Sequence, residues 1–129
     1  MKRELIEKNE VLKLTFEFSI LIIQFCEELE TLRKYDLARQ LFKSGTSIGA
    51  NVKEAQNAES KADFIHKFKI AAKEADETEY WLMLCSEFKN FPETKLLFNK
   101  LDSINKIITK IISTSKNNNK TALANHHIS

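Results

Sequence analysis

Residues 64–85 read FIHKFKIAAKEADETEYWLMLC and carry the clearest periodic pattern of the chain. Apolar or small side chains recur in this stretch at spacings of 4, 3, 4, 3, 4 and 3 residues. They are Phe64, Phe68, Ala71, Ala75, Thr78, Leu82 and Cys85. Because an α-helix makes one turn in about 3.6 residues, this rhythm places all of them on one face. The stretch predicts a helix over residues 60–88 that packs against other helices through that face.

Three further segments have the same kind of periodicity. They span residues 9–34, 36–58 and 93–115. The links between the four segments are short, and short links make consecutive helices antiparallel neighbours. The chain holds only 2 Gly and 1 Pro, so few residues interrupt a helix. We predict an all-α fold, an up-and-down antiparallel four-helix bundle.

Residue types that begin helices stand at three of the predicted boundaries. Asp36 is a candidate N-cap, because its carboxylate can accept from the unpaired amides of a first turn. Ser60 and Asp63 resemble a capping box, with Asp in place of the preferred Glu. Pro92 breaks the preceding helix and can open the last one. These signals support the starts of the second, third and fourth helices.

The last residues differ from the rest in composition. From Lys116 the sequence reads KNNNKT, which is polar and has no helical period. Such a segment has too few apolar side chains to be held in a core. We therefore divide the chain into a bundle domain over residues 1–115 and a disordered polar tail over residues 116–129.

Charge is distributed unevenly, although the formal net charge is only +2. Residues 1–93 carry 14 Lys and Arg against 17 Asp and Glu, a net charge of −3. Residues 94–129 carry 6 Lys against one acid, a net charge of +5. The basic character therefore lies in the last helix and the tail.

The sequence has no feature typical of an exported or membrane protein. Residues 1–4 are mostly charged and do not resemble the start of a signal peptide. The longest uncharged run near them, residues 18–26, falls far short of the roughly 20 residues of a membrane helix. Cys26 and Cys85 lack Cys-x-x-Cys spacing and fall on apolar helix faces, so we expect buried free thiols. We expect a cytoplasmic protein with no membrane partner.

Two blocks of sequence resemble a known bacterial family. Residues 41–55 read LFKSGTSIGANVKEA, and residues 63–82 read DFIHKFKIAAKEADETEYWL. They are similar to the four-helix-bundle family of the 23S rRNA intervening-sequence protein, which carries Ser-Ile-x-Ala-Asn-Ile-x-Glu-Gly on its second helix. Many members carry Phe-Ile-x-x-x-x-Ile-Ala-x-Lys-Glu-Ala-x-Glu-Thr-x-Tyr-Trp-Leu on the third helix. The resemblance departs at Ala55, where many members have Gly, and at Lys43, where many have Arg.

The resemblance implies a bundle fold that assembles into a homo-oligomer, a ring of five subunits. Some relatives are encoded inside insertions in rRNA genes, and the family name implies association with RNA. A related group serves as the accessory protein of the reverse transcriptase in diversity-generating retroelements and resembles a basic pentameric nucleic-acid binder. Lysine at position 43 weakens any expectation of bidentate phosphate contacts there, because only Arg presents a planar fork of donors.

Two small-residue features lie on the second predicted helix. Gly45 and Gly49 form a Gly-x-x-x-Gly, although each glycine costs about 1 kcal/mol relative to Ala inside a helix. Close approach of a neighbouring helix explains them, and backbone contact with a ligand or a second subunit is the alternative. Ser44, Ser47 and Asn51, at one edge of the same stripe, fit a helix–helix hydrogen bond, a subunit contact or a nucleic-acid contact.

Carboxylates gather on the second and third predicted helices, at Glu54, Glu74 and Glu77. Paired carboxylates can perform acid–base chemistry or bind metal. Di-iron bundles, however, use Glu-x-x-His, and His66 has no glutamate at that offset. We expect salt bridges or a subunit interface at these positions, with no metal and no cofactor.

Tyr80 and Trp81 are the residues with the largest capacity for contact, since both combine a large ring with a polar atom. Adjacent residues point about 100° apart on a helix, so at least one of the two lies off the inner face. A subunit interface, ordinary core burial and base stacking are the three interpretations.

Four lysines of the last helix and tail form a candidate nucleic-acid-binding set: Lys95, Lys106, Lys110 and Lys116. They lie opposite the isoleucines of the predicted helix. A solvated face is the simpler interpretation. In a ring, the same stripe repeats in every subunit, and the summed basic surface can hold phosphates.

No Gly-rich phosphate loop, HExxH motif or Ser/His/Asp arrangement occurs in the sequence, so we predict that the protein is not an enzyme. The leading hypothesis is a homo-oligomeric accessory protein associated with RNA or DNA. The alternative is a protein–protein interaction scaffold with no nucleic-acid role, which the near-neutral charge and the Tyr80–Trp81 pair favour.

Overall fold

The computed structural model describes the backbone of residues 3–128 and the side chains of residues 3–117. The described backbone has five helices and no strand. They are α1 (Arg3–Lys8), α2 (Glu10–Thr31), α3 (Tyr35–Ala55), α4 (Lys61–Ser86) and α5 (Lys95–Ile128). The predicted all-α class is confirmed.

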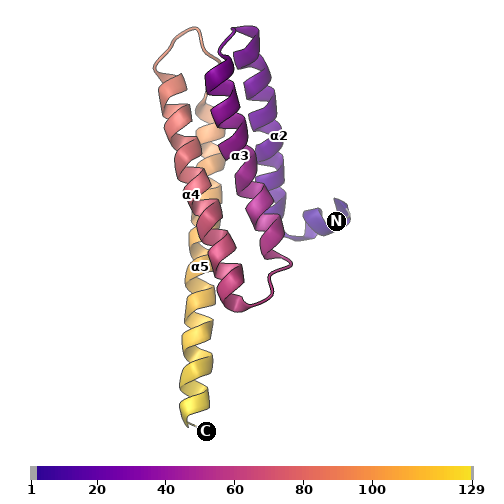
Figure 1. The fold of residues 1–129 in the computed structure, drawn as a ribbon, viewed down its shortest axis with the longest axis vertical. Helices are drawn as coiled ribbons and strands as arrows, with labels where there is room; N and C mark the ends of the chain where they lie inside the picture. Colours follow the sequence, from indigo (N-terminus) through magenta and orange to yellow (C-terminus); the bar gives the residue numbers. More distant parts are fainter. Residues whose placement is uncertain (1–2, 129) are drawn as a thin grey trace.

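The four long helices form the predicted up-and-down bundle (Figure 1). Helix α2 packs against α3 and α5, and α4 packs against the same two helices, which closes the bundle. The short α1 turns aside from the foot of α2 and was not predicted (Figure 1). Asn9 separates the two, because its backbone is extended and its side chain accepts from the amide of Leu12 at 3.1 Å. Asn9 therefore caps α2 and interrupts the helical run that precedes it.

The core lies between the inward faces of the four long helices. Its largest side chains are exposed by 1% or less: Phe18, Ile22, Leu29, Leu41, Ile48, Phe68, Leu82, Leu101, Ile104 and Ile108. Every position of the 64–85 pattern is buried except Phe64, which is half-buried and packs against Phe68 with ring centroids 4.9 Å apart. The helical rhythm therefore identified the inner face of α4.

The close helix approach expected at Gly45 is confirmed. A Cβ atom at Gly45 would lie 2.8 Å from two carbons of the Ile22 side chain on α2. One at Gly49 would lie 3.3 Å from the backbone oxygen of Thr15. Since contacts below about 3.4 Å are repulsive for carbon, glycine lets α2 and α3 pack more closely than alanine would.

The expected N-cap at Asp36 is wrong. Helix α3 begins at Tyr35, its N-cap Lys34 makes no side-chain bond, and the Asp36 carboxylate accepts from Arg39 at 3.2 Å. The cause is the turn before it, where Arg33 takes the left-handed conformation at φ 63°. The amides of Arg33 and Lys34 donate to the last turn of α2, a Schellman motif that leads directly into α3.

The expected cap at Ser60 is confirmed. Its hydroxyl accepts from the amide of Asp63 at 3.0 Å. The carboxylate of Asp63 accepts from the amide of Glu59 at 3.3 Å, one residue earlier than in a regular capping box.

Both expected ends of the last helix differ from the structure. Pro92 does not open α5, which begins at Lys95, where Glu93 Oε1 accepts from the amides of Thr94 and Lys95 at 3.1 Å each. The helical backbone also continues past residue 115 to Ile128, beyond the predicted end of the last helix, and the division into a bundle domain over 1–115 and a tail over 116–129 stays a prediction. Extending an existing helix costs little, because nucleation has already occurred. The side chains beyond residue 117 lie outside the described part.

Candidate interaction surfaces

The two blocks of sequence that carry the family resemblance come together along the contact between α3 and α4. Thr78 Oγ1 donates to Ser44 Oγ at 3.0 Å, and both side chains are fully buried. Lys67 Nζ lies 2.9 Å from Glu54 Oε2 near the surface of the same contact. The hydrogen bond and charge of Glu54 raise the pKa of Lys67. Glu54 thus forms one of the salt bridges expected for the carboxylates.

Ser47 and Asn51 lie beside this contact, but their hydrogen bonds stay within α3. The Ser47 hydroxyl donates to the carbonyl of Lys43, and the Asn51 amide donates to the carbonyl of Ser47 at 2.8 Å. The helix–helix hydrogen bond considered for Ser44, Ser47 and Asn51 is therefore confirmed at Ser44, whereas the other two bond within their own helix. Both remain half-buried. Each side chain satisfies the backbone carbonyl one turn back, as serine commonly does inside helices.

Glu74 is the most perturbed carboxylate of the acidic set. One of its oxygens, Oε2, is buried without a hydrogen-bond partner among the described residues. Burial raises the pKa of Glu74 and the charge of Glu77 raises it further, whereas Lys43 lowers it. Glu77 itself is exposed. No group of three His, Cys, Asp or Glu side chains in the described part of the chain is placed to hold a metal ion.

Tyr80 and Trp81 diverge as the helical geometry requires. Trp81 is half-buried against the core, and its Nε1 is buried with no partner in the part of the molecule that is described. Tyr80 is 55% exposed and meets Trp81 edge-on, with ring centroids 5.1 Å apart. The aromatic off the inner face is therefore Tyr80.

The four candidate lysines of α5 are exposed as expected. At about 100° per residue, Lys95, Lys106 and Lys110 fall within an arc of about 60°, and Lys116 lies about 80° from Lys106. Lys106 pairs with Asp102 at 3.0 Å, so one of the charges on this face is partly neutralised. The helix gathers three of the four predicted lysines on one side and places Lys116 apart.

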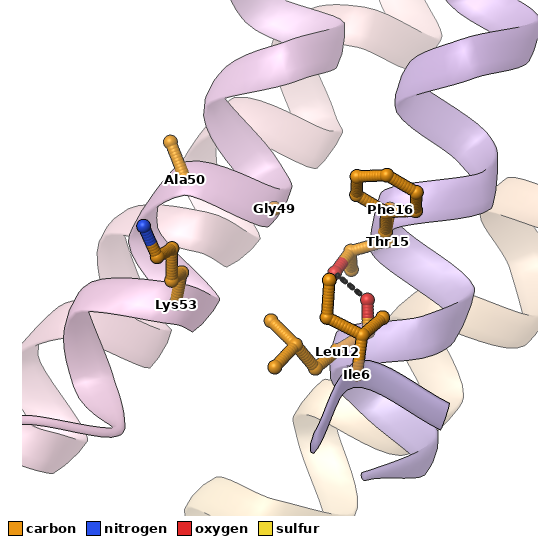
Figure 2. Close-up of a pocket in the computed structure, with 7 residues that line it drawn as sticks. All are labelled: Ile6, Leu12, Thr15, Phe16, Gly49, Ala50 and Lys53. Carbon is orange, nitrogen blue, oxygen red and sulfur yellow. Dashed lines mark hydrogen bonds between the residues drawn. The ribbon is translucent and has the colours of Figure 1, made fainter. Parts of the chain in front are cut away.

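A groove between α2 and α3 was not predicted from the sequence. One of its two hollows has a volume of about 350 Å³, and Figure 2 shows the side chains around it. Phe16 and Leu12 form one wall, Ala50 and Lys53 form the other, and Gly49 lies between them (Figure 2). The other hollow, farther along the same two helices, has a volume of about 400 Å³ and is lined by Glu30, Tyr35, Ala38, Arg39 and Phe42.

Exposed apolar side chains border this groove, and they are the sequence feature from which it could have been predicted. Those that line its hollows are Phe16, Tyr35 and Phe42. Ile20 and Ile23 are two further exposed residues of α2. The apolar residues of α2 cover more of the helix surface than its buried face does. Some of its large apolar residues therefore had to lie outside the core. Sequence rhythm alone does not separate the two sets, because both are apolar at helical spacing.

The two cysteines are buried free thiols, as expected. Burial first, then the charge of Glu30 and the nearby Cys85, raise the pKa of Cys26 to about 12. Burial raises the pKa of Cys85 to about 11. Since the thiolate is the reactive form, neither sulfur is prepared for nucleophilic chemistry at neutral pH.

None of the described helices combines the length and the apolar character that crossing a membrane requires.

Comparisons with known proteins agree with the two sequence blocks. The profile of the 23S rRNA-intervening sequence protein family matches residues 7–110. A crystal structure of a protein of unknown function from the S23 ribosomal protein family of Bacteroides thetaiotaomicron superposes with a TM-score of 0.75 at 40% sequence identity. The match covers 79% of this chain and 97% of that one. No curated protein matches the chain. The chain belongs to the 23S rRNA-intervening sequence protein family.

Proposed function

We propose that the protein is a non-enzymatic, cytoplasmic subunit of a homo-oligomeric ring of five that acts as an accessory protein bound to RNA or DNA. The observation that carries the nucleic-acid part is the lysine face of α5, Lys95, Lys106 and Lys110, on a chain whose first 93 residues are net acidic. A ring repeats this face in each subunit, and phosphate binding grows with the number of cations that neutralise it. Membership in the 23S rRNA-intervening sequence protein family also supports association with a nucleic acid.

A titration with labelled structured RNA and with duplex DNA at about 50 and 200 mM salt tests the nucleic-acid part. We expect binding that weakens steeply with salt. In the Lys106→Gln/Lys110→Gln variant, the slope of log K against log salt should flatten by about 0.9 for each duplex phosphate that is no longer neutralised.

The chain offers a matched control in Lys69 and Lys73, two exposed lysines of α4 with the same four-residue spacing. Replacing them with Gln removes the same charge from a different face. Equal weakening of binding in the two double variants would show that net charge, and not the α5 face, holds the nucleic acid. Absence of binding at the lower salt concentration would overturn the nucleic-acid proposal.

The ring part has its own test, because oligomeric mass does not depend on nucleic acid. Light scattering should give about five times the 14.9 kDa mass of one chain. A mass of one chain at tens of micromolar would overturn the ring.

The second candidate function is a protein–protein scaffold with no nucleic-acid role. The apolar groove between α2 and α3 favours it, since exposed apolar patches mark interaction sites. Oligomerisation without any nucleic-acid binding would favour this alternative.

A further inference from the structure

The exposed large apolar side chains on the long helices form two main groups. One borders the groove between α2 and α3. The other lies on the second half of α4 and just beyond it, at Tyr80, Met83, Leu84 and Phe88. Exposed apolar patches mark interaction sites, and two separate patches can meet in a head-to-tail contact between copies.

The two groups are set in segments of opposite charge. Residues 37–53 of α3 carry Arg39, Lys43 and Lys53 and no acid. Residues 74–88 carry no Lys or Arg and five acids: Glu74, Asp76, Glu77, Glu79 and Glu87. The groove therefore has a basic wall, and the α4 surface is acidic.

The charges of the α4 segment are not neutralised by ion pairs among the described residues. Salt bridges among the described residues join Lys13 to Glu7, Arg39 to Asp36, Lys67 to Glu54 and Lys106 to Asp102. None of them uses an acid from residues 74–88. Lys43 lies close enough to Glu74 to lower its pKa, while the other four acids are exposed. The acidic surface is therefore available for a basic partner.

Four residues of the α4 segment form a regular docking stripe, Asp76, Tyr80, Met83 and Glu87. Their spacing of 4, 3 and 4 residues places them within an arc of about 60°, and all four are exposed. Two apolar side chains are thus flanked by an acid at each end. A helix that lies in a groove presents its anchors at this kind of spacing.

The groove has the complementary pattern. Lys53 borders one hollow, Arg39 borders the other, and Phe42 and Phe16 lie between them. At about 1.5 Å per residue, Lys53 and Arg39 are about 21 Å apart along α3, and Asp76 and Glu87 are about 17 Å apart along α4. Lys and Arg side chains are long enough to span the difference. To meet an acid of the stripe, Arg39 must give up its exposed ion pair with Asp36. Breaking that pair costs little, because exposed ion pairs are weak.

We propose that the Asp76–Tyr80–Met83–Glu87 stripe of one copy of this chain docks into the α2–α3 groove of a second copy. The inference rests on the homo-oligomer of the proposed function and names the surfaces that form it. Because the groove and the stripe are different surfaces, the contact is head-to-tail, and it propagates around a ring until the ring closes. Tyr80 and Met83 enter the apolar hollows, and the basic residues at the ends of the groove meet the acids at the ends of the stripe.

Charge reversal with measurement of mass by light scattering or sedimentation tests the contact. Lys53→Glu should shift the mass toward that of one chain, because the new carboxylate faces an acid at the end of the docked stripe. A second change, Asp76→Lys or Glu87→Lys, should restore the assembly, and the one that does so sets the direction in which the stripe lies in the groove. Tyr80→Ala and Met83→Ala should each weaken assembly at least about tenfold, as expected of central anchors.

Two controls separate this interface from general effects. Leu96→Ser removes an exposed apolar side chain of α5 outside both surfaces, and Lys106→Glu reverses a charge there. Both should leave the mass unchanged, and circular dichroism should show an unchanged helical fold in every variant. An oligomer that survives Lys53→Glu, Tyr80→Ala and Met83→Ala would overturn this inference and leave the ring standing. A wild-type chain that is monomeric would overturn both.

Discussion

Helix α3 lies between α2 and α4, and its two flanks are built differently. Toward α2, glycines at positions 45 and 49 allow a close backbone approach, and the apolar side chains beside it stay exposed. Toward α4, a buried hydroxyl pair and a surface ion pair join the helices. The α4 flank is therefore completed within the chain, whereas the α2 flank leaves an apolar groove for another molecule.

Among the substitutions that test this difference between the two flanks, Gly45→Ala should have the largest effect on stability. The new methyl group would lie 2.8 Å from two carbons of Ile22, a side chain with a stiff χ1 that cannot move aside easily. Overpacking of this kind costs about 1–3 kcal/mol, and the better helix propensity of Ala offsets about 1 kcal/mol. We expect the free energy of unfolding to fall by up to about 2 kcal/mol in a urea titration at fixed protein concentration.

Gly49→Ala is the matched control for that substitution. Its Cβ would lie 3.3 Å from the Thr15 oxygen, a distance that a small shift relieves. We expect a change within about 0.5 kcal/mol, because the gain in helix propensity offsets the crowding. Equal losses of stability in the two variants would show that close approach at Gly45 is not the special feature of this flank.

A smaller effect is expected from Ser44→Ala on the α4 flank. It removes the acceptor of the buried hydrogen bond from Thr78, whose hydroxyl also reaches the carbonyl of Glu74 at 2.8 Å. We expect stability to fall by about 1 kcal/mol, the usual net value of a hydrogen bond. Ser47→Ala, which removes a bond within α3 only, should leave the unfolding midpoint nearly unchanged.

A still smaller effect is expected from Lys67→Gln, which breaks the ion pair with Glu54. The pair is partly exposed, so its contribution should be weaker than that of the Ser44 hydroxyl and should disappear at about 1 M salt. A double-mutant cycle with Glu54→Gln measures the coupling. A coupling that persists in high salt would mean that the pair is shielded from solvent.

The smallest effect is a pH dependence at Glu74. Because burial raises the pKa of this carboxyl in the folded state, its ionised form is disfavoured there. The stability it contributes is present below its unfolded pKa and is lost as pH rises through the folded pKa. Glu74→Gln should therefore raise the unfolding temperature relative to wild type at pH 7 but not near pH 4. An equal increase at both pH values would show that the charge of Glu74 is not responsible.

The sequence rhythm was sufficient to predict the bundle, because burial in a helix must follow a period of about 3.6 residues. It also required one of Tyr80 and Trp81 to lie off the inner face and placed the lysines of α5 on the outside. The start of α3 was mispredicted at Asp36 because a left-handed Arg33 made the turn, a conformation that sequence patterns normally assign to Gly. The extent of α5 was mispredicted because local composition does not reveal that a packed helix can propagate into a polar segment.

The candidate surfaces were only partly predictable. Glu54, Glu74, Trp81 and the serines could be named from the sequence, but their partners depend on the rotation of α4 against α3. The groove needed the structure, because exposed Phe16, Ile20 and Ile23 follow the same apolar pattern as the buried residues of α2. Complementary charge in residues 37–53 and 74–88 is visible in the sequence and becomes informative only when both surfaces are seen to be exposed.

The most direct test of the open α2 flank is crosslinking between two variants of the chain. One carries Ala50→Cys at the groove, and the other carries a cysteine beside one end of the α4 stripe, either Lys73→Cys near Asp76 or Ser86→Cys near Glu87. All three positions are exposed, and the two stripe variants cover both directions in which the stripe can lie. The native thiols are buried with raised pKa values, so they should not react with a short bismaleimide. A crosslinked dimer in the mixture, absent from either variant alone and from a Leu96→Cys partner, is the predicted result. A dimer that forms equally well with Leu96→Cys, or no dimer with either stripe variant in a mixture that is oligomeric, would contradict docking of the α4 stripe on the α2 flank.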